Sequence, residues 1–221
     1  MNRLIISFML CFFLAACNKE KLVWEEVYFE FEMPFTITPN RDTVSVGEVL
    51  RIQAQFSDSL YDLRTKKKYY LPDFNFKIIA GVNELINPLN KIYDQPSAVN
   101  SFTIIDNRNQ ITSATATYIN FYLIYQSGQY WLDIILVPKK KGVYAIQLFN
   151  AGEPGGGYLK LPQSLAPSEP GIKRFPVAQQ HRYLFNEGNS NYEIFKANCL
   201  PFKGTIDTLW EKRATYTFVV K

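Results

Sequence analysis

Apolar and polar residues alternate along much of this chain with a period of two, which is typical of half-buried β-strands. Residues 50–56 show the pattern most clearly, because every second position is apolar: Leu50, Ile52, Ala54 and Phe56. The same pattern predicts further strands over residues 27–32, 74–79, 102–105, 114–125, 130–137, 143–149 and 215–220. No stretch predicts a long amphipathic helix, and we expect at most two helical turns over residues 191–199.

Turn signals separate several of these predicted strands. Ser127-Gly128 predicts a β-hairpin, because glycine adopts the backbone conformation that tight hairpin turns require. Lys141-Gly142 predicts a second turn, next to exposed lysines. Short strands at this spacing, with turns between them, predict an all-β sandwich.

Two local motifs resemble those of immunoglobulin-like domains. Residues 42–48, Asp-Thr-Val-Ser-Val-Gly-Glu, resemble the early strand pair in the Ig-like domains of bacterial surface proteins. Residues 141–144, Lys-Gly-Val-Tyr, resemble the tyrosine corner, in which the tyrosine bonds back to the backbone. Ile146 occupies the position of the usual cysteine, so the resemblance implies an antiparallel Ig-like sandwich without its disulfide, over about residues 34–149.

Glycine and proline are concentrated in residues 150–176. The chain has 11 glycines and 12 prolines, and ten of these 23 residues fall there, so we expect a loop or linker. We expect residues 214–220 to return as a closing strand that pairs with residues 143–149. Residues 25–221 would then be one domain with a loop-rich insertion over 150–213, and long loops on a rigid scaffold are where binding surfaces usually lie.

The first residues of the chain are typical of an export signal. A basic start, Met-Asn-Arg, precedes a mostly apolar run over residues 4–14 that is too short to span a bilayer. Leu14-Ala15-Ala16-Cys17 follows and resembles the lipobox of exported bacterial lipoproteins, here of the Bacteroidota type. The resemblance implies removal of residues 1–16, acylation of Cys17 and a polar tether over residues 17–24. The alternative is an ordinary secretory signal with an incidental cysteine.

Lipidation of Cys17 would anchor the protein in the outer membrane, on either the cell surface or the periplasmic face. Three short motifs also match the Asp-Ser/Thr-aliphatic sequence that Bacteroidota glycosylate on oxygen. Their acceptor hydroxyls would be those of Thr43, Ser59 and Thr208. The alternative is that Asp-Thr and Asp-Ser simply favour turns in these three places.

The charge and the rare residues exclude several classes of protein. A formal net charge of +4 is too small to indicate a nucleic-acid partner. One histidine and three cysteines argue against a His/Cys metal centre and against a disulfide framework, and no cofactor is indicated. Cys199 is expected to be a small buried residue. His181 has no accompanying nucleophile motif, which argues against catalysis.

Two remaining motifs have simple interpretations. Gly155-Gly156-Gly157 lacks the Lys-Ser/Thr pair of a phosphate-binding loop and is expected to be a flexible loop. Glu26, Glu30 and Glu32 would share one face of a strand, where they could form a cation site or acid pair. Solvated surface charges are the favoured interpretation, because no complementary Asp-x-Asp cluster accompanies them.

Aromatic residues are abundant, with 14 Tyr, 17 Phe and 3 Trp. Most are expected in the core, but exposed Tyr and Trp can stack on sugar rings or partner surfaces. The candidate stacking residues are Tyr158, Tyr192 and Trp210. The favoured function is therefore a membrane-anchored, non-enzymatic lipoprotein that presents a binding or assembly surface to a protein or glycan partner. The alternatives are a glycan-binding accessory of a polysaccharide-uptake system and, less favoured, a carboxylate-dependent hydrolase.

Overall fold

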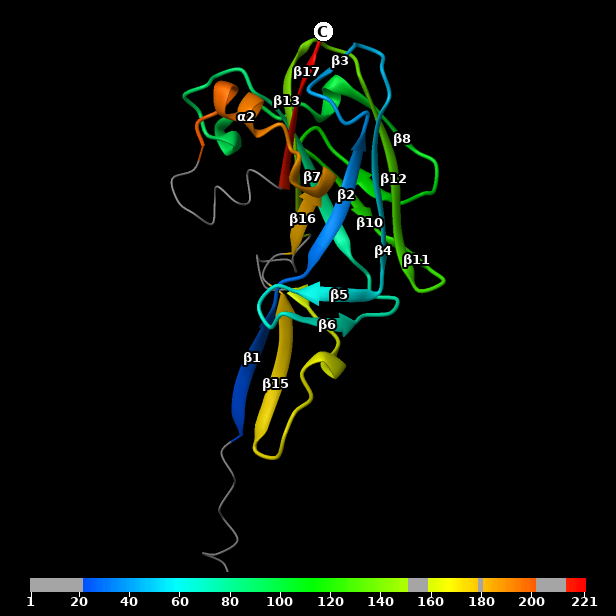
Figure 1. The fold of residues 1–221 in the computed structure, drawn as a ribbon, viewed down its shortest axis with the longest axis vertical. Coiled ribbons are helices and arrows are strands. Elements are labelled where there is room, and N and C mark those ends of the chain that lie inside the picture. The colour runs from blue at the N-terminus through cyan, green and yellow to red at the C-terminus, as the bar shows by residue number, and fades with distance from the viewer. Residues whose placement is uncertain (1–21, 151–158, 179–180, 202–213) are drawn as a thin grey trace, which may run out of the picture.

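Two packed β-sheets form the body of the molecule in the computed structural model, which describes residues 22–150, 159–178, 181–201 and 214–221 (Figure 1). The first sheet has the strand order β3 (Thr43–Val44), β17 (Thr215–Val220), β13 (Gly142–Asn150), β7 (Lys77–Glu84), β10 (Tyr118–Tyr122) and β9 (Ile111–Ala114). The second has the order β11 (Ile124–Gln126), β12 (Gln129–Pro138), β4 (Leu50–Ser57), β2 (Glu32–Thr38) and β16 (Arg182–Phe185), with β8 (Phe102–Asp106) also paired to β12. The predicted all-β, Ig-like sandwich of mainly antiparallel strands is confirmed.

The inward-facing residues of the two sheets form one hydrophobic core. In β4 the burial alternates as the sequence predicts, with Leu50, Ile52, Ala54 and Phe56 buried. Large aromatic rings join the sheets: Phe102 of β8 contacts Tyr144 of β13 edge to face, with 5.0 Å between ring centroids. Such rings bury a large apolar area each, which allows a sandwich of this size to hold together without a disulfide.

The predicted hairpin turn at Ser127-Gly128 is confirmed, whereas the chain at Lys141-Gly142 passes from β12 of one sheet to β13 of the other and so does not form a hairpin. Ser127 (φ 52°) and Gly128 (φ 76°) form a two-residue hairpin loop with positive φ at both positions, and this loop connects β11 to β12. The Tyr144 hydroxyl donates to the carbonyl oxygens of Lys140 and Lys141, at 3.2 and 3.4 Å. The tyrosine therefore bonds back across the β12–β13 turn, as the tyrosine-corner resemblance implies.

The closing strand is also confirmed, because β17 pairs antiparallel with β13 from Gly142 opposite Val220 to Gln147 opposite Thr215. The preceding insertion is less loop-rich than expected. It contains β14 (Leu159–Lys160), β15 (Ile172–Ala178) and β16, so the prediction of a loop up to residue 176 is wrong from Ile172 onward. The glycines and prolines around β15 hide this strand in the sequence pattern. Its Pro176 has no N–H to donate, but the Pro176 carbonyl accepts a hydrogen bond from the N–H of Leu161.

A second, smaller sheet projects from the body, with the order β1 (Val23–Phe29), β15 and β14; we call it the stalk (Figure 1). β1 and β15 run parallel, with Val23 opposite Ile172 and Phe29 opposite Ala178. β1 begins inside the predicted tether of residues 17–24. The hairpin of β5 (Ser59–Asp62) and β6 (Lys67–Tyr70) lies across the junction of stalk and body.

The predicted strand over residues 27–32 is divided at this junction. β1 ends at Phe29 and β2 begins at Glu32, although buried residues alternate from Phe29 onward into β2. The buried Asp62 carboxylate accepts hydrogen bonds from the backbone N–H of Glu30 (2.7 Å) and of Thr65 (2.8 Å). The N–H of Glu30 is thus satisfied by a side chain where the chain leaves one sheet for the other.

Other predicted boundaries also shift. Residues 114–125 form the end of β9, then β10 and β11, which belong to different sheets, and β7 begins at Lys77 rather than at residue 74. The two expected helical turns are α2 (Tyr192–Asn198). Single 3-10 turns occur at η1 (Ile92–Asp94), η2 (Val99–Ser101), η3 (Gln163–Leu165) and η4 (Asn186–Gly188). None of the helices in the described ranges has the length and hydropathy needed to cross a membrane.

Candidate functional site

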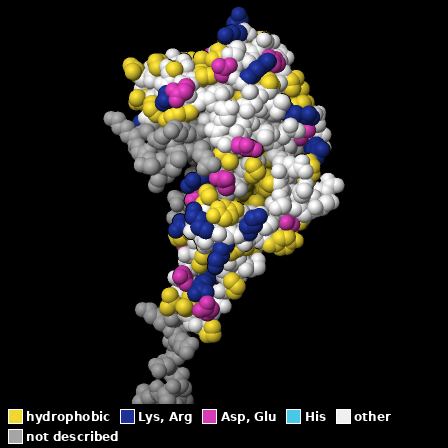
Figure 2. Space-filling model, viewed as in Figure 1, with side chains coloured by type: hydrophobic (Ala, Val, Ile, Leu, Met, Phe, Trp, Pro, Cys, Tyr) yellow, Lys and Arg dark blue, Asp and Glu magenta, His cyan; other side chains and the backbone are white. Residues whose placement is uncertain are grey.

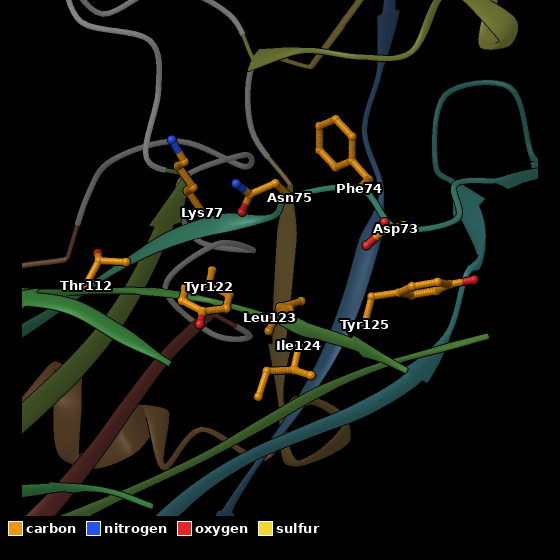
Figure 3. A pocket seen from close by; sticks show the side chains of 9 residues that line it. All are labelled: Asp73, Phe74, Asn75, Lys77, Thr112, Tyr122, Leu123, Ile124 and Tyr125. Atoms are coloured by element: carbon orange, nitrogen blue, oxygen red, sulfur yellow. The ribbon is translucent and has the colours of Figure 1, made fainter. Parts of the chain in front are cut away.

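A pocket of about 590 Å³ opens where the chain crosses from one sheet of the body to the other (Figure 3). Two segments form its opposite sides, residues 73–77 before and at the start of β7 and residues 122–125 from the end of β10 into β11. Its lining residues are Asp73, Phe74, Asn75, Lys77, Thr112, Tyr122, Leu123, Ile124 and Tyr125. We call it the crossing pocket.

Tyr130 of β12 holds the first side of the crossing pocket in place. Its hydroxyl accepts a hydrogen bond from the N–H of Phe74 (2.7 Å) and donates one to the carbonyl of Leu71 (2.5 Å). Burial raises the pKa of Tyr130 to about 12, so the phenol keeps its proton at neutral pH. The Phe76 ring packs edge to face on Tyr130, with 5.0 Å between centroids. The segment is therefore fixed by a buried side chain.

The second side of the pocket is fixed in a similar way. The N–H of Leu123 donates to the carbonyl of Phe76 at 3.2 Å, at the point where the pairing of β7 and β10 ends. The Tyr125 hydroxyl donates to a carboxylate oxygen of Asp58 at 2.7 Å, and this bond raises the pKa of the Tyr125 hydroxyl. Its ring is tilted against Tyr130, with 5.1 Å between centroids.

The chemistry of the crossing pocket is mixed. Phe74, Tyr122 and Tyr125 are half-buried rings that supply apolar surface. Asp73, Asn75, Lys77 and Thr112 are exposed and supply hydrogen-bond donors and acceptors. Asp73 is the one carboxylate among the lining residues, and no histidine or cysteine joins them. Such a lining suits a polar ligand that also has an apolar face.

Tyr192, one of the three predicted stacking residues, lines a different pocket of about 460 Å³ beside α2. It is half-buried, its ring stacks on Phe195 with 6.0 Å between centroids, and the Lys196 ammonium lies 5.2 Å from the ring centroid. Contacts within α2 therefore already occupy much of this ring. The other two predicted stacking residues, Tyr158 and Trp210, lie outside the described residues.

The predicted modification sites lie in different parts of the chain. Thr43 is half-buried in β3, opposite Val219 of β17, whereas Ser59 is exposed at the start of β5. Thr208 and the predicted lipid-bearing Cys17 lie outside the described residues. Cys199 is buried beside α2, as expected of a small core residue.

His181 is buried in an aromatic environment. Its ring centroid lies 5.6 Å from that of Phe31 and 5.5 Å from that of Phe76. Burial lowers its pKa to about 3, so the imidazole is neutral at pH 7. Neither ring nitrogen has a hydrogen-bond partner in the described structure. A group so enclosed cannot reach a ligand at the surface.

Two of the four glutamates in the N-terminal segment, Glu25 and Glu30, form ion pairs with arginines. Glu30 forms an ion pair with Arg182 at 2.8 Å, and Glu25 with Arg174 at 3.0 Å. Within the described ranges, no group of three His, Cys, Asp or Glu side chains is arranged to hold a metal ion. Of the candidate cluster, Glu30 is accounted for by its ion pair, and Glu26 accepts a hydrogen bond from Tyr28.

Trp131 is a candidate ligand-contacting residue that sequence reasoning missed. It lies on the outer face of the second sheet, in a groove of about 270 Å³ that Arg108, Asp133 and Gln55 also line. The Arg108 guanidinium lies 6.0 Å from the Trp131 ring centroid. The alternation of residues along β12 could have identified Trp131. Tyr130 and Leu132 are inward positions, so Trp131 between them must point outward.

No protein-family model matches the chain, and no curated protein matches it. Among solved structures, it is similar to the human F-spondin reeler domain, at 8% identity and a TM-score of 0.32 over 73% of this chain and 88% of that chain. It is also similar to the type II cohesin dyad from the adaptor ScaA scaffoldin of Acetivibrio cellulolyticus, at 10% identity and a TM-score of 0.26 over 67% of this chain and 48% of that chain. TM-scores this low carry no argument about function.

Proposed function

We propose that this chain is an exported lipoprotein of the outer membrane, anchored through Cys17, that binds sugar units of a glycan in the crossing pocket and carries out no catalysis. The observation that supports glycan binding is the lining of that pocket. Half-buried aromatic rings and exposed polar groups share one hollow of about 590 Å³, which is within the size range of small-molecule sites.

A sugar ring matches this lining because it has an apolar C–H face and a rim of hydroxyl groups. The ring of Phe74 or Tyr125 would pack on the apolar face. Asp73 and Asn75 would accept and donate hydrogen bonds at the hydroxyl groups, and Lys77 would donate to ring or hydroxyl oxygens. Tyr130 and Asp58 hold the aromatic residues in position, so little freedom would be lost on binding.

A binding role without chemistry is supported by the lack of paired catalytic groups in the pocket lining. Glycoside hydrolysis commonly uses two carboxylates flanking the scissile bond. Among the described residues, Asp73 is the only carboxylate that lines the crossing pocket, and the nearby Asp58 is 7% exposed with one oxygen bonded to Tyr125. His181 is neutral and enclosed by Phe31 and Phe76.

The position of the stalk is consistent with an anchor at Cys17. β1 extends away from the body, and its first residue, Val23, lies at the end opposite the C-terminus (Figure 1). A lipid on Cys17 would hold the end of the stalk near the bilayer, with the body and the crossing pocket farther out. This arrangement would present the pocket to ligands in solution, from either the surface or the periplasmic face.

Replacing Cys17 with serine tests the anchor. The unmodified chain should partition with membranes on fractionation and incorporate a labelled fatty acid. The Cys17→Ser chain should lose the label and most of the membrane-bound fraction. If the Cys17→Ser chain still carries the fatty acid, the lipoprotein proposal is wrong.

Glycan binding is tested by affinity electrophoresis of the Cys17→Ser chain in gels containing neutral polysaccharides such as xylan, mannan, β-glucan and dextran. We expect retardation by at least one of them. Asn75→Ala, an exposed change that leaves the core intact, and Phe74→Ala should each weaken binding about tenfold, equivalent to one lost aromatic or hydrogen-bonding contact.

Trp131→Ala and Tyr192→Ala are the matched controls, because each removes an aromatic ring from a different pocket. Both should bind the polysaccharide as the parent chain does. Loss of binding on Trp131→Ala alone would move the site to the outer face of the second sheet. Absence of retardation in every gel would overturn glycan binding while leaving the anchor untouched.

A further inference from the structure

The outer end of the stalk carries an exposed aromatic surface. The rings of Trp24 in β1 and Phe175 in β15 stack in parallel, with 5.0 Å between centroids and 1° between planes. The Lys173 ammonium lies 4.9 Å from the Trp24 ring centroid and 5.6 Å from that of Phe175. Trp24 is 64% exposed, and the adjoining Leu22 and Val23 are 52% and 56% exposed. We call Trp24, Lys173 and Phe175 the aromatic face of the stalk.

The exposure of Trp24 does not result from an unpaired chain end. Trp24 lies within a parallel ladder of seven residue pairs, opposite Lys173. Burial along β1 increases toward the body, from exposed residues at Val23 to a buried one at Phe29. The aromatic face is therefore built on regular backbone structure, with its ring held by Phe175.

Neighbouring charged residues of β1 and β15 form ion pairs within the stalk itself. Arg174 pairs with Glu25 at 3.0 Å and with Glu169 at 2.5 Å. The Gln163 side-chain amide donates to the Arg174 carbonyl at 2.9 Å, which fastens the segment around η3 to β15. Phe175 and Lys173 contact the Trp24 ring, but the residue remains 64% exposed, so much of its surface can meet a partner. Figure 2 shows hydrophobic side chains at this lower end, next to basic and acidic ones.

The length of chain between the stalk and Cys17 limits what this partner can be. Leu22 is five positions after Cys17, and a fully extended chain covers at most about 3.6 Å per position, so their Cα atoms are at most about 18 Å apart. A lipid on Cys17 would therefore keep the end of the stalk within about 18 Å of the bilayer surface. Tryptophan is enriched at that surface, where its ring is partly apolar and its N–H meets water or headgroups.

We propose that the aromatic face of the stalk contacts the headgroup region of the membrane that carries the lipid anchor, and so fixes the orientation of the body. The occupant is a lipid surface, and the inference rests on the proposed anchor at Cys17. Trp24 and Phe175 enter the interface, and the Lys173 ammonium reaches phosphate oxygens while its stem covers apolar surface.

The charges around the aromatic face predict how this contact depends on lipid composition. Lys173 and Arg174 are accompanied by Glu25, Glu26 and Glu169, so the stalk end has no basic surplus. Attraction to anionic lipids is therefore not the driving force. The contact should be as close on zwitterionic phosphatidylcholine as on mixtures with phosphatidylglycerol.

Tryptophan quenching by brominated lipids tests the contact. The chain has three tryptophans, so Trp131→Phe and Trp210→Phe leave Trp24 as the only reporter. The acylated chain is reconstituted in phosphatidylcholine vesicles with and without bromine near the top of the acyl chains. We expect Trp24 emission to move to shorter wavelength and to fall about twofold with brominated lipid, because the ring would lie at the interface.

A matched control places the reporter on the body. Tyr93 is 63% exposed, close to the exposure of Trp24, and belongs to η1. The chain with Tyr93→Trp and phenylalanine at positions 24, 131 and 210 should be acylated to the same extent and show no quenching. Equal quenching of both reporters would mean that the body lies on the membrane, which would overturn the proposed orientation.

The outcomes separate this inference from the anchor. If the acylated chain associates with the vesicles but Trp24 is not quenched, the stalk contact is wrong and the anchor stands. Crosslinking of two stalks under those conditions would identify a second copy as the occupant instead. If the chain carries no acyl group at Cys17, the proposed anchor itself fails.

Discussion

The body and the stalk are both built from β-strands, but they bury their residues in opposite ways. In the body, two sheets cover each other, and the side chains of Tyr144, Tyr216 and Phe218 have no exposed surface. In the stalk, one small sheet leaves its aromatic face uncovered, with Trp24 64% exposed. The stability of the chain therefore depends mainly on the body, and the stalk has apolar surface that folding does not use.

The largest expected effect comes from emptying the core of the body. Phe218 of β17 contacts Tyr144, Phe102 and Tyr216, and it has no exposed surface. Phe218→Ala should lower the free energy of unfolding by about 3–5 kcal/mol, from lost burial and the cavity that remains. Urea denaturation measures the change. A loss below 1 kcal/mol would mean that the closing strand contributes little to the core.

The next effect is a dependence of stability on pH through His181. Its pKa is about 3 in the folded chain, where burial disfavours the charged form, and about 6.5 in an unfolded chain. Below pH 6.5 the unfolded state binds a proton that the folded state does not, so the stabilising contribution is complete above pH 6.5 and is lost as the pH falls toward 3. Between pH 6.5 and pH 5, the free energy of unfolding should fall by about 2 kcal/mol from this group alone.

His181→Phe provides the comparison for the pH effect. Phenylalanine places a similar ring between Phe31 and Phe76 and removes the ring nitrogens, which lack hydrogen-bond partners in the described structure. Denaturation curves at pH 7, 6 and 5 should show a flatter profile for the variant. Parallel profiles for the two chains would show that His181 is not enclosed as described.

A smaller effect is expected from the tyrosine corner. Tyr144→Phe keeps the buried ring and removes only the hydroxyl that donates to Lys140 and Lys141. The loss should be about 1 kcal/mol, the usual net contribution of one hydrogen bond. Thermal unfolding checks it, with Tyr70→Phe, a change on a ring that is 65% exposed, as the control. Equal changes in the unfolding temperature of both variants would show that the hydroxyl of Tyr144 does not stabilise the fold.

The regular parts of the body could be predicted from local sequence. The alternation from Leu50 to Phe56 and the turn at Ser127-Gly128 depend on neighbouring residues alone, and so does the corner at Tyr144. Strand β15 could not be predicted in the same way, because its partner β1 lies about 149 residues away and the nearby glycines and prolines indicate a loop. Pairing at such a distance leaves no local pattern.

The crossing pocket was not predictable for a related reason. It exists because residues 114–125 divide between two sheets near Leu123, and because Tyr130 holds Phe74 outside β7. Apolar and polar residues alternate in the same phase on both sides of Leu123, so the sequence pattern predicts a single strand there. Trp24 likewise falls within the predicted tether, because the charged residues after it hide its pairing with β15. Sites formed by contacts between distant segments require the folded structure.

Removing the exposed ring of the stalk should change the stability of the chain least. Trp24→Ser removes a large ring, as Phe218→Ala does, but from a surface already in water. It should change the free energy of unfolding by about 0.5 kcal/mol or less, as exposed substitutions generally do. The same substitution should abolish the contact of the stalk with phosphatidylcholine vesicles.

Tyr70→Ser is the matched control for this last prediction, because Tyr70 is 65% exposed on β6. It should affect neither the free energy of unfolding nor the association of the stalk with vesicles. A loss of several kcal/mol on Trp24→Ser would mean that the stalk folds as part of the core, and its exposed ring could no longer be assigned to a partner. An unchanged stability together with a lost membrane contact would instead separate the two uses of apolar surface, since Phe218 would serve folding and Trp24 would serve attachment.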